Sequence, residues 1–137
     1  MAGAPAILIK GFKMKRAQDY LAEANAVVPK ITPEDGIAKH EAGNSLFIDV
    51  RASTAIDDSG TIAGAVRIDR GFIEFAADDS TPYHNPALTK DADIILVCAA
   101  GGQAALAGKT LKDMGYENVA NVGGIGDWIA AGGKTEA

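Results

Sequence analysis

The segment Ile94-Ile95-Leu96-Val97-Cys98 is the strongest constraint on the fold of this 137-residue chain. All five residues are apolar, so a strand formed here could not expose either of its faces to water. Strands of this kind occur at the centre of parallel sheets whose two faces are covered by helices. Helical spacing of apolar residues follows over 104–114, with an end expected at Gly115. The sequence therefore predicts an α/β fold with a central, mostly parallel sheet and helices on both faces.

Shorter patterns extend this alternation of strands and helices along the chain. Thr32-Pro33 is typical of a helix start, and Gly43 is a suitable helix end. The short helices are expected to turn Phe72, Phe75, Trp128 and Ile129 toward the core. The predicted strands are 46–50, 65–68 and 118–122, the predicted helices are 13–28, 32–43, 71–77 and 125–131, and the predicted loops are 51–60 and 78–93.

Composition and length fit one compact domain. Hydrophobic residues make up 47% and charged residues 23%, a globular rather than a disordered balance. Within that domain, residues 1–30 are predicted to form an N-terminal extension with a helix, and residues 31–137 the main unit.

The charge pattern and the few ligand-type residues exclude several classes of protein. The net charge of −5 argues against nucleic-acid binding, and the basic cluster from Lys10 to Arg16 is typical of a solvated helix start. No stretch is long and apolar enough to span a membrane or to form a secretory signal, so we expect a cytoplasmic monomer or homodimer. A single cysteine excludes a disulfide framework, and His40 and His84 are expected at the surface, so no metal site is predicted.

Cys98 stands at the carboxyl end of the central strand, where sites of α/β proteins lie. A turn, Ala99 to Gly102, separates it from the next helix. Backbone N–H groups of such a turn and of the first helical turn lack partners within the helix and can converge on an anion. They would stabilise a thiolate, and the small alanine side chains should leave the sulfur open to a substrate. The alternative is that Cys98 is an inert apolar residue, as buried cysteines commonly are.

Five segments, in order, resemble motifs of the rhodanese family. They are Asp49-Val50-Arg51, Gly60 to Ala65, Val97 to Ala105, Leu111 to Tyr116, and Asn121 to Trp128 with Ala131-Gly132-Gly133. The likeness covers roughly residues 31–134, and its strength lies in the order and spacing of the five motifs. The chain is similar to the single-domain rhodaneses, which implies a rhodanese-like fold.

The resemblance implies a thiosulfate sulfurtransferase. Cys98 would attack the outer sulfur of a donor such as thiosulfate, hold that sulfur as a persulfide, and pass it to a thiol or cyanide. The resemblance also implies that the substrate is bound by the loop residues Ala99, Ala100, Gly101, Gly102 and Gln103, largely through backbone amides. No metal or organic cofactor is implied.

The loop departs from the family pattern because it contains no cation. Gln103 stands where family members often have arginine, and Ala99 and Ala100 stand where some thiosulfate-using members have cations. Arg51 and Arg70 are the available cations that could bind the sulfonate of thiosulfate. Arg70 is the candidate substrate-binding residue, with a solvated surface position as its alternative, and a structural ion pair is the favoured role of Arg51.

Two further residues are expected to support the site. Arg51 is predicted to form a structural ion pair beneath the loop, and Asp49 to accept hydrogen bonds from the loop backbone.

The departures leave a second function open, a low-turnover sulfur carrier or regulatory binding module. It is favoured by the uncharged loop and by Ala55, Thr61 and Gln103, which replace residues common in the family. A phosphatase or arsenate reductase with a related cysteine loop is a third alternative. Such enzymes need a longer loop closed by arginine, and the arginine is missing here.

Overall fold

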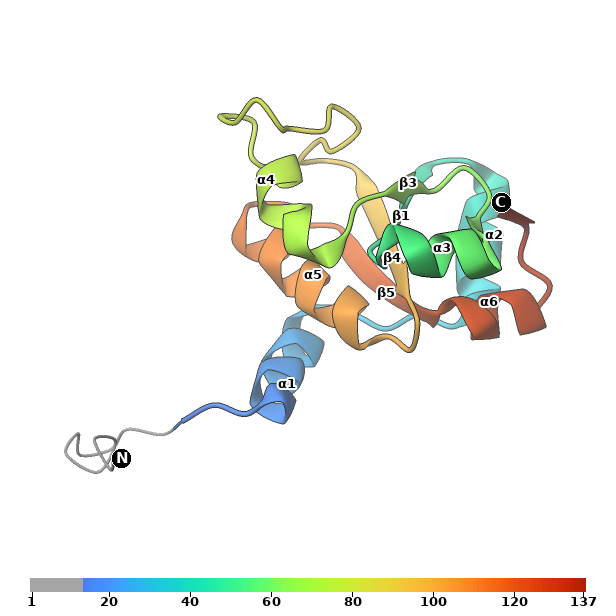
Figure 1. The fold of residues 1–137 in the computed structure, drawn as a ribbon, viewed down its shortest axis with the longest axis horizontal. Coiled ribbons are helices and arrows are strands. Elements are labelled where there is room, and N and C mark those ends of the chain that lie inside the picture. Colours follow the sequence, from blue (N-terminus) through green and yellow to red (C-terminus); the bar gives the residue numbers. More distant parts are fainter. Residues whose placement is uncertain (1–13) are drawn as a thin grey trace.

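A four-stranded parallel sheet forms the centre of the molecule in the computed structural model, which describes residues 14–137 (Figure 1). The strand order is β3-β1-β4-β5, and each neighbouring pair runs parallel. This confirms the predicted α/β fold. The predictions made for residues 1–13 lie outside the described part of the chain. The strands are β1 (Ser45–Asp49), β3 (Val66–Arg67), β4 (Asp93–Cys98) and β5 (Val119–Gly124).

The central strand β4 is buried on both faces, as its apolar run predicts. Ile94, Leu96 and Cys98 belong to one hydrophobic cluster, and Ile95 and Val97 belong to a second. The alternation follows from the two-residue period of a strand, which sends successive side chains to opposite faces. Cys98 thus lies at the last position of β4, among the side chains of the first cluster.

Helices cover both faces of the sheet (Figure 1). One face is packed by α4 (Ile73–Ala77) and α5 (Gly102–Asp113), and the other by α2 (Pro33–Ala42) and α6 (Ile125–Ala130), while α1 (Ala17–Val27) packs against α5. The α2 helix begins and ends where predicted, because the Thr32 side chain accepts a hydrogen bond from the Asp35 N–H and Gly43 adopts the left-handed conformation. No helix within residues 14–137 is long and apolar enough to cross a membrane.

The segment 51–60, predicted to be a loop, instead contains α3 (Ser53–Ser59). The helix is short, and Ile56 is its one fully buried side chain, so no helical period of apolar residues was present to indicate it. A second, two-stranded antiparallel sheet was also missed. It pairs β2 (Thr61–Ile62) with β6 (Thr135–Glu136), and such short strands carry little pattern.

Several predicted orientations were wrong. Phe72 and Phe75 do not face inward: they are 42% and 49% exposed, in the 3-10 helix η2 (Arg70–Phe72) and in α4. Ile73 and Ala76 occupy the inner face of α4 instead. Ile129 is likewise exposed, whereas Trp128 is buried as predicted.

His40 was expected at the surface but is half-buried. Its ring contacts the rings of Phe47 and Trp128 edge-on, and Nε2 lies 2.7 Å from the Ala63 carbonyl oxygen. The aromatic neighbours come from other elements, so the polar residues beside His40 in the sequence could not indicate them.

The N-terminal segment is attached to the sheet and to α5. The Ile31 N–H donates to the Asn121 carbonyl, and the Asn121 N–H donates to the Pro29 carbonyl, both at 2.9 Å. Val28 lies so close to α5 that a Cβ added at Gly108 would lie 2.9 Å from both of its methyl carbons. These contacts fix the segment after α1 beside the middle of β5, while the division of the chain at residue 30 stays a prediction.

Asp93, at the start of β4, joins three elements through its carboxylate. The Lys39 ammonium of α2 donates to it at 3.0 Å, and the Ser45 hydroxyl of β1 donates at 2.6 Å. Burial by itself would raise the pKa of Asp93, but the hydrogen bonds from Ser45 and Lys39 outweigh burial and lower that pKa.

We predict that Asp93→Asn lowers the free energy of unfolding at neutral pH by less than about 1 kcal/mol, because water screens this partly exposed pair. The folded-state pKa is depressed, so the contribution is present above the unfolded value near 3.9 and is lost as pH falls through the folded value. Urea unfolding at neutral and acidic pH measures the difference. Asp113→Asn, which breaks the Lys109 pair within one helix, is the control with a smaller expected effect. An equal loss at both pH values for Asp93→Asn would contradict the account.

Candidate active site

The sulfur of Cys98 accepts two backbone hydrogen bonds from the turn that follows it. The N–H of Gly101 lies 2.9 Å from Sγ, and the N–H of Ala104, in the first turn of α5, lies 3.3 Å from it. Donors held by the backbone keep their positions without any side-chain reorganisation. The arrangement favours a negative charge on this sulfur.

Glycines allow the turn to close around the sulfur. Gly101 adopts a left-handed conformation with φ of 102° and forms the N-cap of α5. At Gly124, a Cβ would lie 2.3 Å from the Ala99 carbonyl oxygen, so no larger residue could let the turn pass so close to the end of β5. Backbone conformation at Gly101 and crowding at Gly124 therefore explain why these two motif positions are occupied by glycine.

Asn121 supports the turn from β5, a role that the sequence did not reveal. Its Nδ2 donates to the Gly101 carbonyl at 2.9 Å, and its Oδ1 accepts from the Gly123 N–H at 2.8 Å. The side chain is buried, with 2% of the residue exposed. The available hint was a single polar residue within the otherwise apolar run Val119 to Val122.

The sulfur is not open, contrary to the expectation from the small loop side chains. Cys98 is only 1% exposed, although Ala99, Ala100 and Gln103 are all exposed. The Cys98 side chain belongs to the first hydrophobic cluster and accepts hydrogen bonds from the backbone of the turn, so small alanine side chains do not expose the sulfur. A reacting partner therefore needs the turn to shift, or must approach along the edge of the turn.

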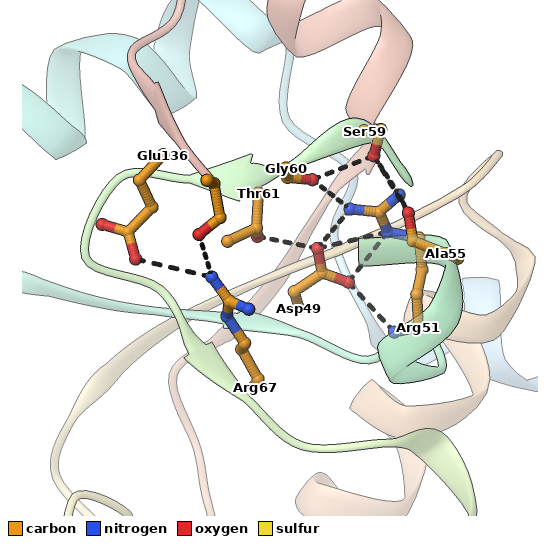
Figure 2. Close-up of polar contacts among 9 residues, drawn as sticks. Asp49, Arg51, Ala55, Ser59, Gly60, Thr61, Arg67 and Glu136 are labelled. Atoms are coloured by element: carbon orange, nitrogen blue, oxygen red, sulfur yellow. Dashed lines mark hydrogen bonds and ion pairs between the residues drawn. The ribbon is translucent and has the colours of Figure 1, made fainter. Parts of the chain in front are cut away.

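Asp49 and Arg51 form a buried ion pair at the end of β1 (Figure 2). The guanidinium donates to both carboxylate oxygens, with Nη2 at 2.7 Å from Oδ2 and Nε at 3.1 Å from Oδ1. Thr61 Oγ1 also donates to Oδ2 at 2.7 Å, and the backbone N–H that donates to Asp49 is that of Arg51. The predicted structural ion pair is thus present.

The ion pair does not act on the cysteine turn in the way predicted. Arg51 Nη1 donates to Ser59 Oγ at 2.8 Å, and Nη2 donates to the Gly60 carbonyl at 2.8 Å. Both acceptors lie at the end of α3 (Figure 2). Cations stabilise the carbonyl end of a helix, so Arg51 anchors α3 to β1.

Arg70, the candidate substrate-binding residue, uses its guanidinium to join two helices. Nη1 donates to Glu74 of α4 and Nη2 to Thr110 of α5, both at 3.1 Å. Among residues 14–137, no hydrogen bond connects Arg70 with the segment from Cys98 to Gln103. A role of Arg70 in substrate binding stays a prediction.

A pocket of about 280 Å³ lies beside the cysteine turn. Four elements form its wall: α1, the segment that follows α1, the turn leading into α5, and β5. Cys98 itself does not line the pocket. The lining residues are Leu21, Asn25, Lys30, Ile31, Ala100, Gly101, Gly102, Ala105, Asn121, Val122 and Gly123.

A family model described as the rhodanese-like domain matches residues 32–131. The chain belongs to the rhodanese family. In Bacillus subtilis (strain 168), "Putative sulfur carrier protein YrkF" is 28% identical over 125 residues, or 90% of this chain. The chain spans 61% of the length of that rhodanese relative.

Solved structures share the rhodanese fold. A protein of unknown function from Rhodopseudomonas palustris, described as a possible tyrosine phosphatase, has 35% identity and a TM-score of 0.85, covering 93% of this chain and 99% of its own. A rhodanese-like domain from Anabaena has 27% identity and a TM-score of 0.66, covering 80% and 79%. The polysulfide-sulfur transferase homodimer from Wolinella succinogenes, at 24% identity, has a TM-score of 0.69 over 87% of this chain and 85% of its own.

We predict that Arg51→Ala lowers the free energy of unfolding by about 3–5 kcal/mol, because the Asp49 carboxylate stays buried and loses its counter-ion. Thr61→Val, which removes one hydrogen bond to the same carboxylate, should cost about 1–3 kcal/mol. Denaturant unfolding measures both variants. Arg67→Ala, at an exposed ion pair with Glu136, is the control and should cost less than about 1 kcal/mol. If Arg51→Ala costs no more than Arg67→Ala, the buried pair does not hold this end of the sheet.

Proposed function

We propose that the protein is a sulfurtransferase in which Cys98 carries sulfane sulfur as a persulfide, from a donor such as thiosulfate to a thiol or cyanide. The observation that carries the proposal is the pair of backbone N–H groups, from Gly101 and Ala104, directed at Cys98 Sγ. Membership of the rhodanese family over residues 32–131 supports it. We expect the protein to act in the cytoplasm, as a monomer or a homodimer.

The proposed chemistry has two displacement steps. The Cys98 thiolate attacks the outer sulfur of thiosulfate, the S–S bond of the donor breaks, and sulfite leaves with the electron pair. The acceptor then attacks the outer sulfur of the persulfide, and the Cys98 thiolate leaves. The sulfur of Cys98 is anionic before and after each cycle, which is the state that the two amides favour.

A second candidate, a sulfur carrier with little turnover, is favoured by the lack of positive charge at the turn. No cation is present between Cys98 and Gln103, and the two nearby candidates, Arg51 and Arg70, already bind Asp49 and Glu74. The name of the Bacillus relative agrees with this candidate. A carrier would accept and release sulfur, yet bind thiosulfate weakly because its sulfonate finds no counter-ion.

Phosphatase activity, suggested by the description of the Rhodopseudomonas relative, has less support in this chain. A phosphate ester requires planar, bidentate contacts of the kind that arginine gives to a tetrahedral oxyanion. The segment from Cys98 to Gln103 contains no arginine, and Gln103 occupies its last position. We therefore do not expect this turn to hold a phosphate.

The main prediction is that the protein forms thiocyanate from thiosulfate and cyanide, and that Cys98→Ser abolishes this activity. Serine cannot form a persulfide, while its similar size should leave the fold intact, as circular dichroism would verify. Full activity of Cys98→Ser would overturn the sulfurtransferase proposal. Stoichiometric sulfur loading of the wild type without turnover would favour the carrier.

A second prediction is that Gln103→Arg raises kcat/KM for thiosulfate by roughly fivefold. The side chain is exposed in the first turn of α5, so the substitution should not disturb packing, and it adds a cation that can bind the sulfonate. Gln103→Met, of similar length but uncharged, is the matched control. If both variants behave like the wild type, the missing charge at this position does not limit use of thiosulfate.

A further inference from the structure

The pocket beside the cysteine turn has a wall that the family match does not include. Leu21, Asn25, Lys30 and Ile31 all precede residue 32, where the rhodanese-like match begins. Leu21 reaches the turn, since a Cβ at Gly102 would lie 3.6 Å from its Cδ2. The N-terminal segment of this chain therefore builds a cavity onto the edge of the proposed active site.

Lys30 gives the pocket its charge. It is the one charged residue among those described that line the cavity, and within residues 14–137 no carboxylate forms an ion pair with it. Its backbone is fixed by the bridge to Asn121. The amide of Asn25 adds a hydrogen-bonding group, and the remaining wall is mostly apolar or backbone. The Asn121 amide already bonds Gly101 and Gly123. This lining suits a small ligand with an apolar part and one anionic group.

The pocket is separated from the sulfur by a single residue. Gly101 lines the pocket, and its N–H lies 2.9 Å from Cys98 Sγ. Cys98 does not reach the cavity. A ligand bound in the pocket must therefore extend its reacting atom past Gly101 to meet the sulfur.

We propose that this pocket selects the sulfur acceptor, a small thiol that bears a carboxylate, and that Lys30 binds that carboxylate. The inference rests on the proposed transfer of sulfur through Cys98. The acceptor thiolate attacks the outer sulfur of the Cys98 persulfide, the S–S bond breaks, and the Cys98 thiolate leaves with the electron pair. The product is the persulfide of the acceptor, and the proton lost from the acceptor thiol goes to solvent.

Thiosulfate does not fit the same role. In thiosulfate the sulfonate oxygens and the reacting sulfur are attached to the same central sulfur atom, so the donor has no chain between its anionic group and its reacting atom. A thiol such as 3-mercaptopropionate places its carboxylate and its sulfur at opposite ends of a short chain. This chemical difference between the two molecules is the reason for assigning the pocket to the acceptor and not to the donor.

The test compares two acceptors in wild type, Lys30→Met and Lys30→Arg, with thiosulfate as donor. The acceptors are 3-mercaptopropionate and its methyl ester, and rates are corrected for the thiolate fraction of each. Lys30→Met should raise KM for the acid by about fivefold, the effect of losing one exposed ion pair, with kcat unchanged. It should not change kcat or KM for the ester or for thiosulfate. Lys30→Arg should keep the wild-type KM for the acid, because arginine retains the positive charge. Lys134→Met, an exposed lysine that does not line the pocket, is the matched control.

Equal KM values for the acid in wild type and Lys30→Met would overturn the inference, while Cys98-dependent thiocyanate formation would stand. A rise in KM for thiosulfate in Lys30→Met would place the donor, not the acceptor, at Lys30 and would also overturn it.

A binding measurement is independent of turnover. Titration with 3-mercaptopropionate should shift the NMR amide signals of Gly101, Gly102 and Gly123 in wild type, and much less in Lys30→Met. No such shift in the wild type contradicts the inference. If the signals shift but no sulfur is transferred, the pocket binds the ligand as inferred, and the proposed sulfurtransferase function is contradicted instead.

Discussion

The rest of the site depends on the hydrogen bonds that the Gly101 and Ala104 N–H groups donate to the Cys98 sulfur. They exist because β4 ends in a buried cysteine and α5 begins a few residues later, so unpaired amides of the helix start point back at the strand end. Gly101, Gly124 and Asn121 allow and hold that turn. The buried Asp49–Arg51 pair fixes the neighbouring inner strand β1 to α3 without contributing charge to the turn.

The positive charges around the cysteine turn lie outside the turn itself. The described contacts of the turn with the Cys98 sulfur are two backbone N–H groups, while Arg51 and Arg70 are paired with carboxylates. The cation that remains without a carboxylate partner among the residues lining the pocket is Lys30, contributed by the N-terminal segment. In our account, amides hold the sulfur and Lys30 chooses the molecule that receives it. The two tasks are therefore performed by separate parts of the chain.

The sequence was sufficient for the sheet and for the position of the cysteine, because an apolar run buried on both faces is a strong pattern and the family motifs are ordered. The sequence was insufficient for α3, where Ile56 is the one fully buried residue. It was also insufficient for the exposed Phe72 and Phe75, because η2 and α4 are too short for a helical pattern to define their buried face. The role of Asn121 depends on a contact with Gly101 in another element, and the pocket depends on the approach of residues 29–31 to β5, far along the chain; no local pattern encodes either. Burial of the sulfur likewise depends on how closely the backbone of the turn approaches it, not on side-chain size.

The central claim, that Cys98 carries sulfur, is tested most directly by mass spectrometry of the protein after exposure to thiosulfate or to a polysulfide. The account predicts a gain of the mass of one sulfur atom, located on the peptide containing Cys98, absent from Cys98→Ser and removed by cyanide. If the wild type gains no sulfur from either donor, or gains it equally without Cys98, the cysteine at the end of β4 is a buried apolar residue and the account is wrong.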